Sequence, residues 1–166
     1  MENGRQTDRG KTGDQEGIKM TALTHGIINL NGYDIGPDTT LHEMFEAFPK
    51  ARRIGNGKEY LLLAQMGLLQ NENVVFVGRF SFQNEVLLYW QLSPACVEYP
   101  KGSDSAMERR IQREFCESWL KSHLGEPDIR IDNESIYYQD WGTVSVSTPK
   151  DSQNGSEISA SYKRAH

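Results

Sequence analysis

The run "NVVFVGRFSFQNEVLLYWQLSP", residues 73–94, decides the fold class. Two stretches rich in branched and aromatic residues, 73–82 and 85–94, flank the polar pair Gln83-Asn84. Such residues suit a pleated, half-buried surface, and a short polar break between two of these stretches is typical of a β-hairpin. The run therefore predicts an antiparallel strand pair, with Gly78 as a β-bulge.

Shorter strands are expected on both sides of this pair. Residues 26–36, "GIINLNGYDIG", predict a strand or a bent hairpin that turns at Asn31-Gly32, and residues 59–66, "EYLLLAQM", predict a buried strand. On the C-terminal side, short β-prone runs separated by turn residues predict further strands at 129–131, 136–138, 143–148 and 157–162.

A helix is predicted at residues 39–48. Leu41, Met44, Phe45 and Phe48 recur at helical spacing, and Thr40 with Glu43 has the pattern of a capping box. The proline that follows Phe48 cannot continue a helix, so this helix has about three turns and one apolar face.

A second helix is predicted at residues 105–124. Ser105 and Glu108 have the capping-box pattern, and apolar residues from Met107 onwards repeat along one face. Gly125 stands where a left-handed C-cap is favoured.

Long consecutive runs of strands between few helices are typical of an antiparallel sheet with helices on one side. The sequence therefore predicts an α+β fold. We expect an antiparallel sheet of about six to eight strands, with two helices, at about 39–48 and 105–124, packed on one face.

The polar N-terminus is expected to stand apart from this domain. Residues 1–19 contain one aliphatic residue, Ile18, and four basic and four acidic side chains. Such a segment cannot bury enough apolar surface to offset its ordering entropy, so we expect a disordered leader or a non-native extension. Residues 20–166 are predicted to form a single domain, which is cytoplasmic because no secretion signal or membrane-spanning run is evident.

The net charge of −5 excludes some partners and favours others. A mildly acidic domain is a poor electrostatic match for nucleic acid and for anionic membranes, and neither is predicted as a partner. It suits a basic protein partner, although an acidic balance is also ordinary among soluble proteins.

Motifs that would indicate catalysis or metal binding are weak. His42 and Glu46 lie four residues apart on a helix, but two ligands do not make a zinc site, and a solvated pair is the favoured interpretation. No nucleophile elbow, P-loop or dinucleotide fingerprint occurs. Cys96 and Cys116 are interpreted as reduced thiols. We predict no cofactor, no metal and no catalytic residue.

The C-terminal run contains the candidate binding residues. In "YYQDWGTVSVS", residues 137–147, the two tyrosines must point to opposite faces of a strand, and Ser145 and Ser147 alternate with valines. Tyr138, Asp140, Trp141, Ser145 and Ser147 are therefore the predicted partner-binding residues. The competing interpretation makes Trp141 a core residue in a bend, with its indole N–H bonded to a carbonyl.

The runs "WLKSHLGEP" and "YYQDWGTVSVSTPKDSQNGSEISASY" cover about a third of the chain. This C-terminal third resembles the tail of small uncharacterised bacterial α+β proteins of immunity or inhibitor type. The resemblance implies a protein that neutralises a toxin by binding it. It transfers no functional residue to this chain.

Three functions follow as hypotheses. The first is a non-catalytic cytoplasmic protein-binding domain, in its most concrete form an immunity-type inhibitor of a basic toxin. The second is a small enzyme or ligand-binding domain with a pocket between the helices and the sheet, using some of Asp34, Asp140, His42 and Tyr138. The third is a scaffold or assembly subunit.

Overall fold

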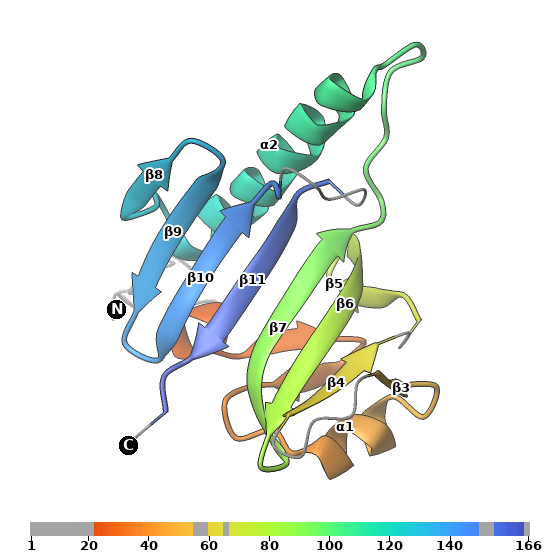
Figure 1. The fold of residues 1–166 in the computed structure, drawn as a ribbon, viewed down its shortest axis with the longest axis vertical. Coiled ribbons are helices and arrows are strands. Elements are labelled where there is room, and N and C mark those ends of the chain that lie inside the picture. Colours follow the sequence, from red (N-terminus) through yellow and green to blue (C-terminus); the bar gives the residue numbers. More distant parts are fainter. Residues whose placement is uncertain (1–21, 55–59, 65–66, 150–154, 165–166) are drawn as a thin grey trace, which may run out of the picture.

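The strand pair predicted from residues 73–94 forms the two longest strands of the computed structural model (Figure 1). Strand β6 (Val74–Gln83) pairs antiparallel with β7 (Val86–Pro94) through a tight turn at Asn84-Glu85, one residue later than predicted. Asn84 and Glu85 have φ values of 50° and 65°, the left-handed backbone that a two-residue hairpin turn requires. The central hairpin of the fold is therefore confirmed.

The bulge in this pair is not at Gly78, where the sequence predicted it. The register shifts between Ser81 and Phe82, while Gly78 pairs regularly with Leu92. A Cβ atom on Gly78 would lie 2.6 Å from Leu69 Cδ1 and 3.0 Å from Leu92 Cδ2. The glycine is needed because neighbouring side chains fill the space above it, rather than because the strand bends.

The structure describes residues 22–54, 60–64, 67–149 and 155–164. The predicted leader, residues 1–19, lies outside this part of the chain. In chain order the elements are the 3-10 helix η1 (Ala22–His25), β1 (Ile28–Leu30), β2 (Tyr33–Ile35), α1 (Leu41–Ala47), β3 (Arg52–Ile54), β4 (Tyr60–Ala64), β5 (Leu69–Asn71), β6, β7, α2 (Ser105–Leu124), β8 (Ile129–Ile131), β9 (Glu134–Gln139), β10 (Gly142–Ser147) and β11 (Glu157–Tyr162).

The main sheet is antiparallel, with the order β3-β4-β6-β7-β11-β10-β9-β8 and with β5 added beside β6. Strands β1 and β2 form a separate hairpin. The prediction of an α+β fold with two helices packed against an antiparallel sheet is confirmed. In the described part of the chain the main sheet has nine strands, more than the six to eight predicted. Two of them, β3 and β5, have only three residues each and were not predicted.

Helix α2 covers one face of β9, β10 and β11 and lies behind these strands in Figure 1. Cys116 and Leu120 are fully buried there, and the ring of Trp119 meets the ring of Phe76 edge-on at 5.4 Å. On the same side, the hydroxyl of Ser135 donates to Glu117 Oε1 at 2.7 Å. The face of the sheet that carries Ser135, Tyr137, Val144 and Val146 is therefore the inner face.

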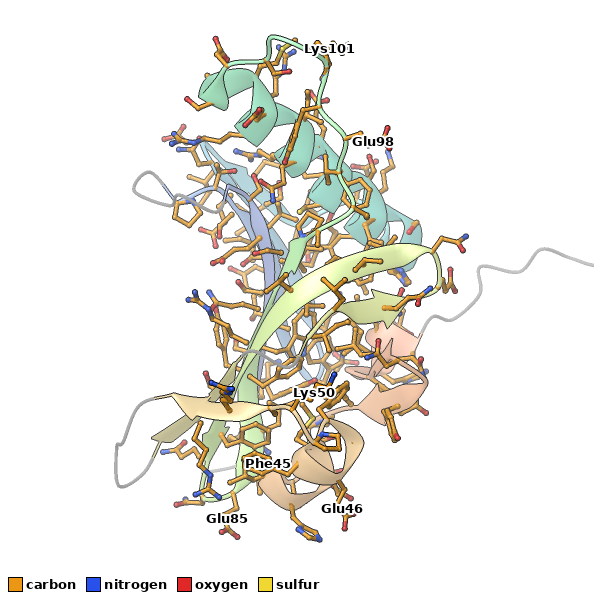
Figure 2. All side chains as sticks on the ribbon, turned by 90° about the vertical axis from the view of Figure 1, so that its right-hand side faces the viewer. Phe45, Glu46, Lys50, Glu85, Glu98 and Lys101 are labelled. Carbon is orange, nitrogen blue, oxygen red and sulfur yellow. The ribbon has the colours of Figure 1, made fainter. Side chains whose placement is uncertain are left out.

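Helix α1 lies at the opposite end of the long axis, where Figure 2 labels Phe45 and Glu46, whereas Glu98 and Lys101 mark the α2 end. The predicted capping box of Thr40 and Glu43 is present. The N–H of Leu41 donates to the carbonyl of Glu85 at 2.8 Å, so the start of α1 is tied to the β6–β7 turn.

The cap of α2 differs from the prediction by one residue. Asp104, not Ser105, is the N-cap, and its carboxylate accepts the N–H of Met107 at 2.8 Å. At the other end Gly125 is the C-cap, with φ 81° and ψ −147°; this positive-φ backbone favours glycine, but it is not the left-handed helical cap that was predicted.

Tyr162 joins three distant segments of the chain in the core. The indole Nε1 of Trp90 donates to the Tyr162 hydroxyl at 3.0 Å, and that hydroxyl donates to the carbonyl of Gly26 at 2.9 Å. Trp90 is fully buried and Tyr162 is 4% exposed, so water cannot replace either bond. These bonds connect β7, β11 and the turn that follows η1.

We expect Tyr162→Phe to lower the free energy of unfolding by about 1–3 kcal/mol, because the N–H of Trp90 and the carbonyl of Gly26 each lose a buried partner. Urea unfolding at neutral pH measures this change. Tyr138→Phe is the matched control, since that ring is 56% exposed, and it should change the free energy by less than about 0.5 kcal/mol. Equal effects of the two variants would contradict the buried bridge.

Burial also predicts a loss of stability at alkaline pH. Desolvation raises the pKa of the Cys116 thiol from 9.0 to about 12, and desolvation also raises the pKa of Tyr162 to about 12. Above pH 9 the unfolded chain releases the thiol proton while the folded chain keeps it, so the free energy of unfolding falls as pH rises. The fall approaches about 1.4 kcal/mol per pH unit for each such group between its two pKa values.

Urea unfolding from pH 8 to 10 tests the thiol contribution before the tyrosine contributes. Cys116→Ala should flatten the slope in this range relative to the unmodified chain, although it lowers stability at pH 8 through lost packing. A slope that Cys116→Ala leaves unchanged would show that this thiol does not contribute.

Candidate interaction surface

The face of the sheet opposite α2 presents a continuous surface across five strands, and Figure 1 looks onto it. Strand alternation places every second residue there, and the strand register aligns these residues in rows across the sheet. One row contains Ile129, Ile136, Ser145, Ser159 and Gln91. We refer to this side of the sheet as the outer face.

A second row, from the next pairing position, contains Tyr138, Thr143, Ser161 and Tyr89. A third row contains Ile131, Glu134, Ser147 and Glu157. Three of the five predicted partner-binding residues, Tyr138, Ser145 and Ser147, therefore share the outer face. The pairing of Ser145 with Ser159 shows that the two serine runs meet side by side across β10 and β11.

Apolar side chains gather at the β8 edge of the outer face. Ile129 is 38% exposed, Ile131 54% and Tyr138 56%, and the half-buried Ile136 pairs with Ile129. We call Ile129, Ile131, Ile136 and Tyr138 the edge patch. Tyr137, the neighbour of Tyr138, is 2% exposed on the inner face, which confirms that the two tyrosines point to opposite sides.

Sequence reasoning missed Ile129 and Ile131. Their strand was predicted, but neither isoleucine was among the predicted binding residues. Arg130, between them, points to the other face, and its Nη2 donates at 3.1 Å to Oε2 of Glu126, which follows α2. The acid four residues before this arginine is the signal in the sequence that would have indicated which way the strand faces.

Trp141 is directed towards the core and not onto the outer face. It lies with Asp140 in the turn between β9 and β10, and its ring contacts the ring of Tyr162 with centroids 5.3 Å apart. A Cβ atom on Gly26 would lie 2.8 Å from Trp141 Cδ2, so the indole packs directly on that glycine. The buried indole Nε1 has no hydrogen-bond partner among the described residues, so the predicted bond to a carbonyl is absent there.

Acidic groups border the edge patch. Asp140 is exposed in the β9–β10 turn, Glu134 lies on the outer face opposite Ile131, and Asp128 Oδ2 accepts the N–H of Tyr138 at 2.7 Å. Burial raises the pKa of Glu157 in the third row, and Gln91 Nε2 donates to Glu157 Oε1 at 2.7 Å. Asp128, Glu134 and Asp140 give the patch a negative rim, whereas Glu157 lies two strands away on β11.

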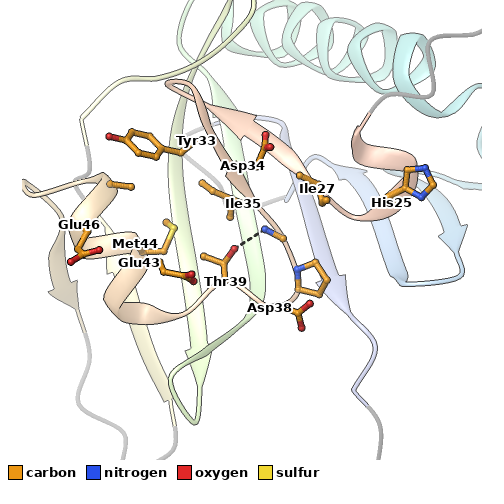
Figure 3. A pocket seen from close by; sticks show the side chains of 13 residues that line it. His25, Ile27, Tyr33, Asp34, Ile35, Asp38, Thr39, Glu43, Met44 and Glu46 are labelled. Carbon is orange, nitrogen blue, oxygen red and sulfur yellow. Dashed lines mark hydrogen bonds between the residues drawn. The ribbon is translucent and has the colours of Figure 1, made fainter.

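A cleft of about 770 Å³ lies elsewhere, between the β1–β2 hairpin and α1. Figure 3 shows Tyr33, Asp34 and Glu43 around it, with His25 at its far side. The cleft therefore lies between one helix and the small hairpin, rather than between both helices and the main sheet. Of the four residues named for such a pocket, only Asp34 lines it; His42, Tyr138 and Asp140 do not.

Two of the four carboxylates that line the cleft, Asp34 and Glu43, make hydrogen bonds that stabilise the fold. Asp34 Oδ1 accepts from Asn29 Nδ2 at 2.9 Å, and Glu43 Oε2 accepts the N–H of Thr40 at 2.7 Å in the capping box. These bonds to Thr40 lower the pKa of Glu43. His42 and Glu46 form the predicted solvated pair, 3.2 Å apart on the surface of α1. The cleft is large enough for a small molecule, and the carboxylates of Asp34, Glu43 and Glu46 that line it already have partners within the chain.

The described ranges contain no group of three or more His, Cys, Asp or Glu side chains that could hold a metal ion. The thiol of Cys116, with its pKa raised to about 12, is a poor nucleophile at neutral pH. No helix in the described part of the chain is long and apolar enough to cross a membrane.

No protein-family model, curated protein or solved structure matches the chain.

We expect Gly26→Ala to destabilise the protein more than Gly102→Ala, because only Gly26 lies against Trp141. Both glycines have positive φ, 77° and 78°, so both variants carry the same backbone strain, but a Cβ on Gly102 has nothing within 4 Å. The added overpacking at Gly26 should lower the free energy of unfolding by a further ~1–3 kcal/mol, measured by urea denaturation. Similar losses of stability in the two variants would contradict the packing of Trp141 on Gly26. Trp141 would then again be a candidate binding residue.

Proposed function

We propose that the chain is a non-catalytic cytoplasmic protein-binding domain that holds a positively charged partner on its outer face. The observation that carries the proposal is the edge patch. Exposed isoleucine and tyrosine side chains lie together there, on adjacent strands and in register. Contiguous exposed apolar surface is uncommon on monomeric proteins and marks interaction sites, and tyrosine is among the residues enriched in them.

The hydroxyl rows beside the patch suit a flat interface. Ser145 stands between Ile136 and Ser159, and Ser147 and Thr143 continue the same smooth surface on β10. Small side chains lose little conformational entropy when they are covered, and they allow a partner to approach the sheet closely. Ser145 and Ser147 therefore allow a partner to fit closely against the sheet, while Tyr138 and the isoleucines contribute the apolar area that the partner buries.

The outer edge of β8 is the end of the sheet in the described chain, since β8 pairs with β9 alone. An uncovered edge strand can accept a strand of a partner through main-chain hydrogen bonds. Beside it, Asp128, Glu134 and Asp140 favour a basic partner, because opposite charges accelerate association and exclude acidic competitors. An immunity-type inhibitor of a basic toxin is the most concrete form of this function.

The cleft beside α1 supports a second candidate, binding of a small molecule. Its volume of about 770 Å³ falls in the range typical of ligand pockets, roughly 300–1,000 Å³. The structural use of Asp34 and Glu43 favours binding over catalysis at this site.

The test compares three variants as baits. Ile131→Lys with Tyr138→Lys places two positive charges in the edge patch. Leu68→Lys places one positive charge at an apolar residue outside the patch that is 65% exposed, and Asp34→Asn alters the cleft. A partner recovered with the unmodified chain is purified, and its dissociation constant is measured for each variant by biolayer interferometry.

We expect the patch variant to weaken binding at least about 100-fold, since two anchors are replaced by charges that repel a basic partner. Leu68→Lys should change it less than about threefold, and association should slow as salt increases. Loss of binding in Asp34→Asn alone would favour the cleft instead. A self-associated chain that the patch variant converts to monomers would favour the scaffold hypothesis. Partner binding that the patch variant leaves unchanged would contradict the edge patch as the binding site.

A further inference from the structure

We propose that a second, cationic pocket binds a small phosphate ester through Arg109, Arg110 and Arg113. The pocket has a volume of about 420 Å³. It lies between α2, the turn from β8 to β9 and the chain that leaves β10, and Figure 1 shows the upper end of β10 in front of α2. Asn133 and Thr148 contribute polar side chains from these two connections, and Ala106 and Pro149 contribute small apolar walls.

The charge of this pocket is opposite to that of the chain. The chain has a net charge of −5, yet three of the described lining residues are arginines and none is a carboxylate. Arg109 and Arg113 are four residues apart on the helix, a spacing at which like charges destabilise a helix by a few tenths of a kcal/mol. A bound dianion would relieve this repulsion.

The nearby acids neutralise the arginines only in part. Arg110 Nε lies 3.8 Å from Glu114 Oε1, and both side chains are about two-thirds exposed, so this pair contributes little. The guanidinium of Arg109 forms no hydrogen bond or ion pair with any residue in the described ranges. Within the described part of the chain the guanidinium of Arg109 therefore has no acidic partner, and its positive charge can interact with a ligand.

Arg113 is held in position before any ligand arrives. Its side chain is 21% exposed, its Nη1 donates to the carbonyl of Asp132 at 3.0 Å, and its Nε lies 3.3 Å from Glu117 Oε1. Glu117 in turn accepts the hydroxyl of Ser135. A guanidinium has five N–H donors, so this arrangement leaves three for an anion while removing much of the conformational freedom that binding would cost.

Hydrogen bonds also hold the wall of the pocket that faces α2, which Asn133 and Thr148 form. The N–H of Thr148 donates to the carbonyl of Asn133 at 3.1 Å, which ties the two connections together. The Thr148 hydroxyl lies 2.7 Å from the hydroxyl of the fully buried Ser156. Asn133 and Thr148 thus line the pocket together with the three arginines, on connections that hydrogen bonds hold in place.

Phosphate is the anion that this set of donors fits best. Planar guanidinium groups match the oxygens of phosphate in pairs, and several positive charges favour a dianion over a carboxylate. The volume admits a phosphate with a small organic group, and the overall negative charge of the chain disfavours long polyanions such as nucleic acid. This site is on the α2 side of the sheet and does not depend on the protein partner proposed above.

Isothermal titration calorimetry tests the proposal with inorganic phosphate, ribose 5-phosphate and ribose as probes, in chloride buffers of matched ionic strength. Arg109→Gln with Arg110→Gln removes two exposed charges whose guanidinium groups have, among the described residues, no ion pair beyond the weak one with Glu114. Lys50→Gln is the control, because it removes one positive charge at the α1 end of the molecule, where Figure 2 labels Lys50.

We expect saturable binding of phosphate and of ribose 5-phosphate, no binding of ribose, at least about tenfold weaker binding in the arginine variant and no change in the control. Amide shifts of Asn133 and Thr148 in NMR spectra should accompany binding. Tighter binding of ribose 5-phosphate than of phosphate would identify an ester as the ligand, and the reverse order would assign the site to the free anion. Absence of saturation below about 10 mM for both anions, or equal affinity in the arginine variant, would overturn the proposal.

Discussion

The hydroxyl of Tyr162 is the contact on which the arrangement of the fold depends. It accepts from the indole of Trp90 and donates to the carbonyl of Gly26, so a central strand, the C-terminal strand and the N-terminal turn meet at one buried atom. The indole of Trp141 packs against the ring of Tyr162 and against Gly26. Because Trp141 is held there, the β9–β10 turn is positioned, and with it the edge of the sheet that carries Tyr138.

The two faces of the sheet are used differently. The inner face is filled by Phe76, Trp90 and the apolar side of α2. The outer face has hydroxyl groups over β10 and β11, a group of exposed apolar side chains at the β8 edge, and the exposed Val77 on β6. Negative and positive charges also lie at different sites: carboxylates border the edge patch, and arginines of α2 line a separate pocket. One small chain thus presents an apolar, acidic surface and a basic concavity, and these fit ligands of different chemistry.

Features that depend on neighbouring residues could be predicted from the sequence. The bounds of α2 follow from apolar spacing and from Gly125, and the capping box of Thr40 and Glu43 is a contact within one turn. Asp104 took the cap predicted for Ser105 because both side chains can accept a hydrogen bond from the first turn. Strands β3 and β5 were missed because three residues contain too little periodicity to distinguish a strand from a loop.

The sequence by itself determined the class of fold, the two helices and the opposite directions of Tyr137 and Tyr138, because hydrogen bonds and alternation along a short segment are enough to set them. Only the tertiary structure decided that Trp141 packs inwards on Gly26, that Ile129 and Ile131 face outwards, and that Arg109, Arg110 and Arg113 meet Asn133 and Thr148 across a pocket. These contacts join residues far apart in the chain. Their formation depends on which segments close against one another when the whole core is buried, and no local pattern encodes that choice.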